Sequence, residues 1–269
     1  YLDLQLGAWR AELAAIPDAS AHEIPEPGAW FELTAPRFRY GAEPNQPIPQ
    51  LDTQQPSVSD GTVGGRLSRT LGRLDLGLIA ASGLDFEPLG RVRVDDGEPV
   101  IEQYYKRRAL YGLQAETALG GLVFRMEASY QPNRTFNTRT ENVLGAERLT
   151  QWRVAAGVDM DAPLGIFLNA QYLHDQVMDG PDTLIRPKTD RIVTVFAQRR
   201  FLQENLLLEA RWYGEPENGG GLARVAVEYQ VGTDTRLQLT GDYFYGGSAG
   251  IFGQFERRDR ISLVLERTF

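Results

Sequence analysis

The chain of 269 residues contains no cysteine, only two histidines and no long apolar run. The absence of cysteine excludes disulfide bonds and thiolate metal sites, and it suits an oxidising compartment. Because about 18 consecutive apolar residues are needed to cross a bilayer as a helix, a transmembrane helix is excluded. Lys plus Arg number 28 against 36 Asp plus Glu, so the net charge of −8 offers no basic surface for nucleic acid.

Apolar residues instead recur at every second position along most of the chain, and helical spacing is rare. Leu122, Phe124 and Met126 share one face of such a stretch, whereas Arg125 and Glu127 share the other. The same alternation runs through residues 151–160, 205–212, 222–230 and 235–246. The pattern predicts antiparallel strands with one apolar and one polar face.

The links between these strands alternate in length. Counting Tyr1–Leu13 as the first strand, we expect about twelve strands. The expected short links lie near Leu71–Gly72, Gly120–Gly121, Asp161–Pro163, Gln203–Glu204 and Gly232–Thr233. The expected long, polar links are Ala14–Gly61, Asp85–Gln103, Gln131–Glu147, Met178–Lys188, Gly214–Gly220 and Gly247–Arg257. Short turns at one end and long loops at the other are typical of outer-membrane barrels.

Aromatic residues gather at both strand ends when the apolar face is taken as the outer one. At the long-loop ends we expect Tyr105, Tyr130, Trp152, Tyr172, Trp212 and Tyr243, and at the short-turn ends Phe201, Tyr229 and Phe269. Two such girdles bracket the apolar band of a membrane barrel. The sequence therefore predicts an all-β protein: residues 1–269 form one transmembrane, antiparallel, up-and-down β-barrel in the bacterial outer membrane, with short periplasmic turns and long extracellular loops.

In a closed barrel the last strand, which ends "RISLVLERTF", pairs with the first, so its backbone groups are satisfied within lipid. Phe269 would then belong to the periplasmic girdle. A terminal Phe after alternating apolar residues also resembles the signal that the bacterial barrel-assembly machinery recognises, although Arg267 stands where an aromatic residue is usual. The start "YLDLQLGAWR" lacks the features of a signal peptide, and we expect that any such peptide has been removed.

Charged residues alternate with the apolar ones and must face the lumen, because an Arg facing lipid costs about 2–4 kcal/mol at the bilayer centre. The predicted pore-lining residues are Arg66, Arg73, Asp75, Glu116, Arg125, Glu127, Arg153, Glu209, Arg211, Arg224, Glu228, Arg236, Asp242 and Glu266. Two interpretations stay open. The charges either line an open pore and tune its selectivity, or form pairs that brace a narrow lumen.

The sequence offers no catalytic constellation. His174 has Asp175 beside it, but no Ser completes a triad, and His22 lies in a Pro-rich stretch. The two histidines do not have metal-ligand spacing, so we expect no enzyme activity, no metal and no cofactor. The segment 14–61 is predicted to be an extracellular loop that either folds inward, caps the mouth or remains on the surface; "AWFELTAPRFRY" within it could add a strand.

Several stretches resemble one family. "VGGRLSRTLGRLDLGLIAASGLDFEP", "RALYGLQAETALGGLVFRMEASY" and above all the closing "GIFGQFERRDRISLVLERTF" make residues 56–269 similar to the DUF1302 family of proteobacterial outer-membrane proteins. The resemblance implies a porin-like barrel, in some members linked to hydrophobic compounds, and it carries no catalytic residues across. Family members are commonly longer than this chain.

These expectations together favour a channel, or porin-like facilitator, for small molecules, hydrophobic compounds among them. The alternative is a structural anchor or docking subunit of a multi-protein assembly, with a plugged lumen. The expected partners are outer-membrane lipid and lipopolysaccharide, the barrel-assembly machinery through the C-terminal strand, and proteins of an assembly; no nucleic acid is expected.

Overall fold

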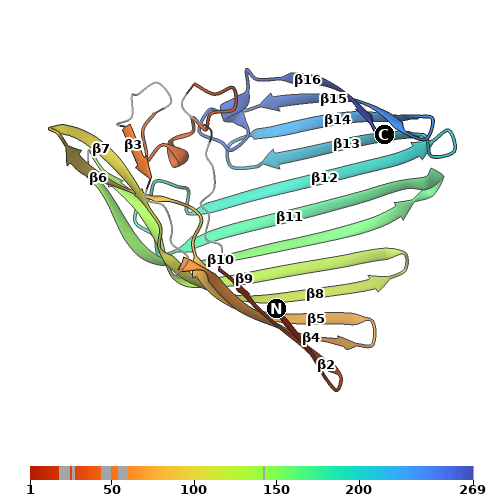
Figure 1. Cartoon of the computed structure of the whole chain (residues 1–269), viewed down its shortest axis with the longest axis horizontal. Coiled ribbons are helices and arrows are strands. Elements are labelled where there is room, and N and C mark those ends of the chain that lie inside the picture. The colour runs from red at the N-terminus through yellow and green to blue at the C-terminus, as the bar shows by residue number, and fades with distance from the viewer. Residues whose placement is uncertain (18–24, 26–27, 44–49, 54–59, 142, 269) are drawn as a thin grey trace.

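A computed structural model describes residues 1–17, 25, 28–43, 50–53, 60–141 and 143–268, and these residues form an all-β structure (Figure 1). The described residues contain sixteen strands and three 3-10 helices of three residues each: η1 (Pro36–Phe38), η3 (Pro163–Gly165) and η4 (Gly253–Phe255). The predicted all-β, antiparallel class is therefore confirmed.

Thirteen strands form one antiparallel sheet in which every strand pairs with its neighbours in chain order, apart from the members of a second, small sheet. In order they are β1 (Leu2–Leu6), β2 (Trp9–Ile16), β4 (Thr62–Leu71), β5 (Leu74–Leu84), β8 (Arg107–Leu119), β9 (Leu122–Thr140), β10 (Val143–Ala162), β11 (Ile166–Met178), β12 (Thr189–Phe201), β13 (Leu206–Glu215), β14 (Gly220–Val231), β15 (Thr235–Tyr245) and β16 (Arg260–Arg267). This neighbour-to-neighbour order is the up-and-down connectivity that the sequence predicts.

The large sheet has thirteen strands where about twelve were predicted, and the difference begins at the first strand. Residues 1–13 do not form one strand, because a turn at Gly7 and Ala8 folds them into the hairpin of β1 and β2. Gly7 has φ 63, a conformation that glycine adopts without strain. The apolar residues change at this turn from even positions (2, 4 and 6) to odd positions (9, 11 and 13), a change that one continuous strand does not allow for. Strand β2 also extends to Ile16, three residues into the predicted loop 14–61.

Two of the predicted long loops contain regular structure. The link 85–106 contains the hairpin of β6 (Leu89–Asp95) and β7 (Glu98–Tyr104), which joins β3 (Gln50–Thr53) in the small sheet. The predicted loop 131–147 is instead the far half of β9 and β10, strands of 19 and 20 residues that extend past the rest of the sheet. The predicted additional strand in "AWFELTAPRFRY" was also wrong, since residues 36–38 form η1.

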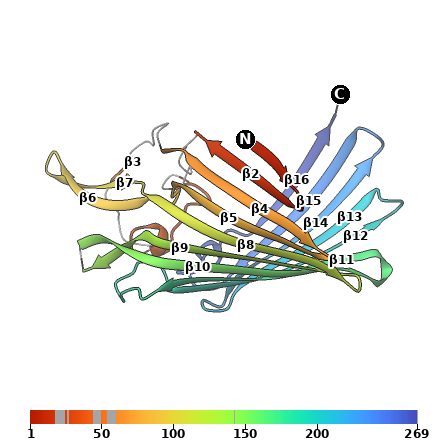
Figure 2. The same cartoon turned by 90° about the horizontal axis from the view of Figure 1, so that it is seen from below.

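The large sheet curves into a trough whose two edges are β1 and β16 (Figures 1 and 2). No pairing joins β1 to β16 in the described residues, so the sheet is open along this line and the predicted closed barrel is not observed. The small sheet, the segment containing η1 and the segment containing η4 lie at the long-loop end of the trough (Figure 2).

Buried apolar side chains concentrate at that same end. Leu84, Leu89, Ile101, Phe136 and Val177 are each 6% exposed or less, and they lie where the hairpins meet the sheet. The body of the sheet has no comparable layer, and large apolar side chains there are mostly exposed. The fold therefore has a core at its long-loop end and a sheet with two accessible faces elsewhere.

Candidate functional site

Charged side chains occupy the concave face of the trough. Because directly paired residues of antiparallel strands share a face, the register can be followed across the sheet. One such row runs Asp159, Asn169, Phe196, Arg211, Arg224, Asp242 and Arg260. The register places these predicted pore-lining residues on the concave face: Arg66, Asp75, Glu116, Arg125, Glu127, Arg153, Glu209, Arg211, Arg224, Glu228, Arg236, Asp242 and Glu266. Whether they line a pore stays a prediction.

Arg73 does not belong to this set. It lies in the turn between β4 and β5, where Gly72 has φ 63, and its side chain is exposed beyond the strand ends. Arg73 was predicted to line the pore because it has an odd residue number, like Asp75 on the charged face of the following strand. That strand begins only at Leu74, however, so Arg73 does not share its face.

Most charges on the concave face are paired across strands. Asp242, with a side chain 1% exposed, lies between Arg224 at 2.5 Å and Arg260 at 2.6 Å. Arg236 pairs with Glu266 on the neighbouring strand, and Arg211 lies 3.2 Å from Glu209. The pairs of Asp242 and Glu266 connect adjacent strands, whereas Arg211 and Glu209 both belong to β13. The charges on the concave face therefore also hold neighbouring strands of the trough together.

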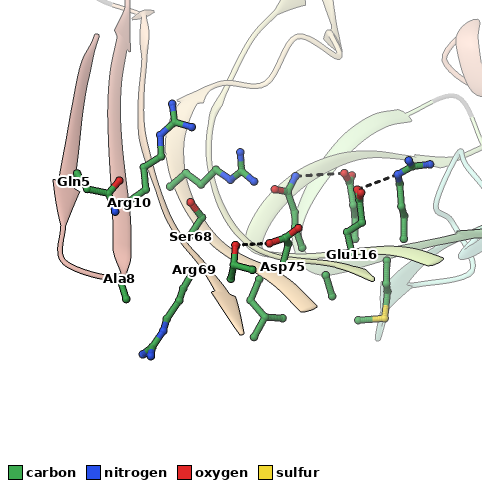
Figure 3. A pocket seen from close by; sticks show the side chains of 16 residues that line it. Gln5, Ala8, Arg10, Ser68, Arg69, Asp75 and Glu116 are labelled. Atoms are coloured by element: carbon green, nitrogen blue, oxygen red, sulfur yellow. Dashed lines mark hydrogen bonds and ion pairs between the residues drawn. The ribbon is translucent and has the colours of Figure 1, made fainter. Parts of the chain in front are cut away.

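A polar cavity of about 590 Å³ lies on the concave face toward the short-turn end of β2, β4, β5, β8 and β9 (Figure 3). Within it Thr70 donates to Asp75 at 2.5 Å, and Arg125 donates to Glu116 at 3.0 Å. Arg66 also lines this cavity, and its guanidinium lies 3.7 Å from the carboxylate of Glu12. The cations and carboxylates of this polar cavity thus remain accessible to water.

At the other end a segment crosses the concave face; residues 28–43 are called the mouth segment below. Its backbone N–H groups at Thr34 and Ala35 both donate to Gln254 Oε1, at 2.8 and 3.0 Å. Phe31 packs with Phe244 and Phe255 at ring-centroid distances of 6.1 and 5.5 Å. The described part of the predicted loop therefore packs against the rest of the structure, and whether it narrows a lumen or caps a mouth stays a prediction.

The opposite half of the mouth segment is fixed by Tyr40. Its phenol oxygen accepts a hydrogen bond from Gln103 at 2.7 Å, and its ring covers Gly90, where an added Cβ would lie 2.6 Å from the ring. Tyr40 is 8% exposed, and this burial raises the pKa of its phenol to about 12. The mouth segment therefore spans from the C-terminal strands to the β6–β7 hairpin.

A network of charges lies beneath and beside the mouth segment. Arg37 pairs with Asp190, which also accepts from Arg186 at 2.7 Å. Arg186 lies 3.0 Å from Asp175, to which Arg153 donates at 2.8 Å. The network continues through Gln151 to Arg134, a side chain only 3% exposed, and from there to Asp85 and Glu87. The predicted pore-lining residue Arg153 is its one member that sequence reasoning identified.

A second cavity of about 640 Å³ opens between the mouth segment and the concave wall. Its lining combines charged residues of the network with the apolar side chains of Phe38, Ile79, Leu110, Leu173, Ile192 and Ile251. Sequence reasoning missed Arg37 and Phe38, because nothing in a Pro-rich stretch indicates which of its residues turn inward. This cavity can hold a small molecule with apolar and polar parts.

The convex face carries most of the aromatic residues that were predicted for the two girdles. By register Tyr130, Trp152, Tyr172, Trp212 and Tyr243 lie on it toward the long-loop end, and Phe201 and Tyr229 toward the short-turn end. Tyr105 is an exception, because it lies between β7 and β8 and belongs to no strand; Tyr111, which pairs with Tyr130, lies on the convex face instead. Phe269, predicted for the lower girdle and the assembly signal, lies outside the described residues.

The histidines show no catalytic arrangement in the described part of the chain. His174 lies on the convex face, 5.1 Å from the Trp152 ring, and its Nδ1 is 3.2 Å from the Tyr172 hydroxyl. His22 lies outside the described residues. Where the structure describes the chain, no three His, Asp or Glu side chains gather closely enough to hold a metal ion.

Comparisons with known proteins add no relative. No helix in the described residues is long and apolar enough to cross a membrane. No family model, no curated protein and no solved structure matches the chain. The resemblance to the DUF1302 family therefore stays a prediction.

Proposed function

We propose that this chain forms the wall of a β-barrel in the bacterial outer membrane and acts as a channel for small molecules, hydrophobic compounds among them. The observation that carries the proposal is the contrast between the two faces of the sheet. Paired charges cover the concave face, and large apolar side chains stand exposed along the convex one.

The convex face is more apolar than a surface in contact with water. Val225, Leu239, Leu263 and Ile261 are 58%, 47%, 68% and 83% exposed, and the register places all four on this face. Contiguous apolar patches beyond a few hundred Å² are rare on soluble monomers and mark contacts with another apolar phase. Aromatic residues toward both ends of the strands fit the two interfaces of a bilayer.

The trough can close into a barrel in two ways, which differ in how its two edge strands are joined. Because β1 and β16 are the first and last of thirteen strands that alternate in direction, they run the same way. An all-antiparallel barrel would therefore need an odd number of further strands between them, whereas direct closure would make one parallel pair. Either arrangement would satisfy the edge hydrogen bonds within lipid.

The route that we propose for solutes follows the concave face. The polar cavity of about 590 Å³ and the mixed cavity of about 640 Å³ lie along it, and the mouth segment crosses its long-loop end. A solute with an apolar part would be accepted by the mixed cavity and then pass the charged wall.

Flux into liposomes that contain the purified protein tests this function. We expect small solutes to enter faster than into empty liposomes, and Ala155→Trp, which places a bulky side chain on the concave face, to reduce the rate severalfold. Val154→Trp is the matched control, because the neighbouring residue faces the other side. If the wild-type protein gave neither conductance nor flux, this result would contradict transport.

The anchor alternative has one observation in its favour, which is the number of contacts that hold the mouth segment across the concave face. A lumen that is obstructed permanently would suit a docking subunit. Co-purification of a stoichiometric protein partner from the native membrane, together with absent flux, would favour this function over transport.

A further inference from the structure

The convex face carries a basic hollow just beyond the upper aromatic residues. This cavity of about 610 Å³ is lined by residues of β8, β9 and β10 and by the link before β8, among them Lys106, Arg107, Tyr111, Pro132 and Arg148. Its lining includes no Asp or Glu. In a chain of net charge −8, such a concentration of cations has to be explained.

An irregularity in β9 creates the hollow. Asn133 has φ 53, and the pairing of β9 with β10 shifts register between Leu149 and Gln151. Beyond the shift, Arg148 pairs with Thr135, so it lies beside the same part of β9 that Pro132 and Asn133 line. The hollow thus lies at this irregularity of the two long strands.

Four cations line the hollow, and three of them are not neutralised; the fourth, Arg108, lies 3.8 Å from Asp85. Within the residues that the structure describes, Lys106, Arg107 and Arg148 form no ion pair. Arg107 donates only to the backbone oxygens of Gly61 and Ser82, at 3.2 and 3.4 Å, and Lys106 lies over the ring of Tyr104 at 5.5 Å. All three side chains are exposed, as is Tyr111 below them.

We propose that this hollow binds the phosphate group of a membrane lipid headgroup. Arg and Lys are the side chains that proteins use for phosphate, and basic pockets at a membrane surface bind anionic headgroups. Tyr111 and its neighbour Tyr130 pack against the upper part of the acyl chains, which places the phosphate at the height of the cations. The proposal rests on the proposed function, because it needs the convex face to contact lipid.

Thermal unfolding in detergent, followed by tryptophan fluorescence, tests the site. We expect phosphatidic acid to raise the midpoint of the wild-type protein, and phosphatidylcholine to raise it much less. The variant Lys106→Gln/Arg107→Gln/Arg148→Gln should need roughly thirtyfold more phosphatidic acid for half the shift, since each cation near an anionic lipid contributes. Arg73→Gln/Arg200→Gln/Arg257→Gln removes the same charge outside the hollow and should behave as wild type.

Two outcomes would overturn the proposal. An unchanged response of the triple variant would show that the hollow is not the site, and an equal shift with inorganic phosphate would show a site for soluble anions. If the triple variant does not fold, Arg148→Gln alone should still weaken the response about threefold. Insertion and flux, measured on the same proteins in liposomes, separate this result from the proposed function, because both should be unchanged when Lys106, Arg107 and Arg148 are replaced.

Discussion

Arg37 of the mouth segment and Asp190 at the start of β12 are joined by two parallel hydrogen bonds, of 2.9 and 2.8 Å. Their side chains are 12% and 11% exposed, so the pair is largely removed from water. Paired bonds between a guanidinium and a carboxylate are among the strong interactions of proteins. This pair is the most direct link between the mouth segment and the strand beneath it.

Loss of the pair should release the mouth segment. We expect Arg37→Gln to weaken its docking by about 1–3 kcal/mol, because Asp190 loses two bonds to a charged group but keeps Arg186. Solute flux should rise, and hydrogen exchange within residues 28–43 should be faster. Arg91→Gln is the control, since it removes an equally paired but exposed arginine in β6. Unchanged flux and exchange would contradict a gating role.

The docking should also depend on alkaline pH through Tyr40. Burial raises the pKa of Tyr40 from its usual value near 10 to about 12. Because the folded-state pKa is the higher one, this contribution to docking is fully present below pH 10 and is lost as the pH rises toward 12. Tyrosinate absorbance, titrated against pH, measures this ionisation. The absorbance that wild type gains and Tyr40→Phe lacks should appear with a midpoint near pH 12. A difference centred near pH 10 would show that Tyr40 is accessible to water.

The two faces of one hairpin should tolerate arginine differently. Val225 lies on the convex face and Thr240 on the concave one. In a bilayer we expect Val225→Arg to lower the free energy of unfolding by about 2–4 kcal/mol, whereas Thr240→Arg should change it little. Urea unfolding from lipid vesicles measures both. Equal effects would mean that the convex face does not contact hydrocarbon.

The alternation of side chains allowed much of the fold to be predicted. Arg211 and Trp212 lie on the concave and convex faces as their parity indicates, because a regular strand sends successive side chains to opposite faces. The turns near Gly120–Gly121 and Gly232–Thr233 were also predicted correctly, since left-handed glycines close them.

The errors arose where a change in the parity of the apolar residues was overlooked or where strands are polar. At the turn at Gly7 the apolar residues change from even to odd positions, and one strand was predicted there instead of two. The far halves of β9 and β10 are polar because they pack against β6 and the mouth segment, through contacts such as Asn137 to Gly90. Tertiary contacts of this kind, and the inward position of Arg37, cannot be inferred from local pattern.

The central claim, that hydrocarbon covers the convex face and water the concave one, is tested most directly by spin labels at two neighbouring positions of β15. The absence of cysteine makes Leu239→Cys and Gln238→Cys specific attachment sites, and the register puts them on opposite faces. In lipid vesicles, oxygen should relax the label at position 239 more strongly, and a water-soluble nickel complex the label at position 238. Equal access of the nickel complex to both labels would contradict the account.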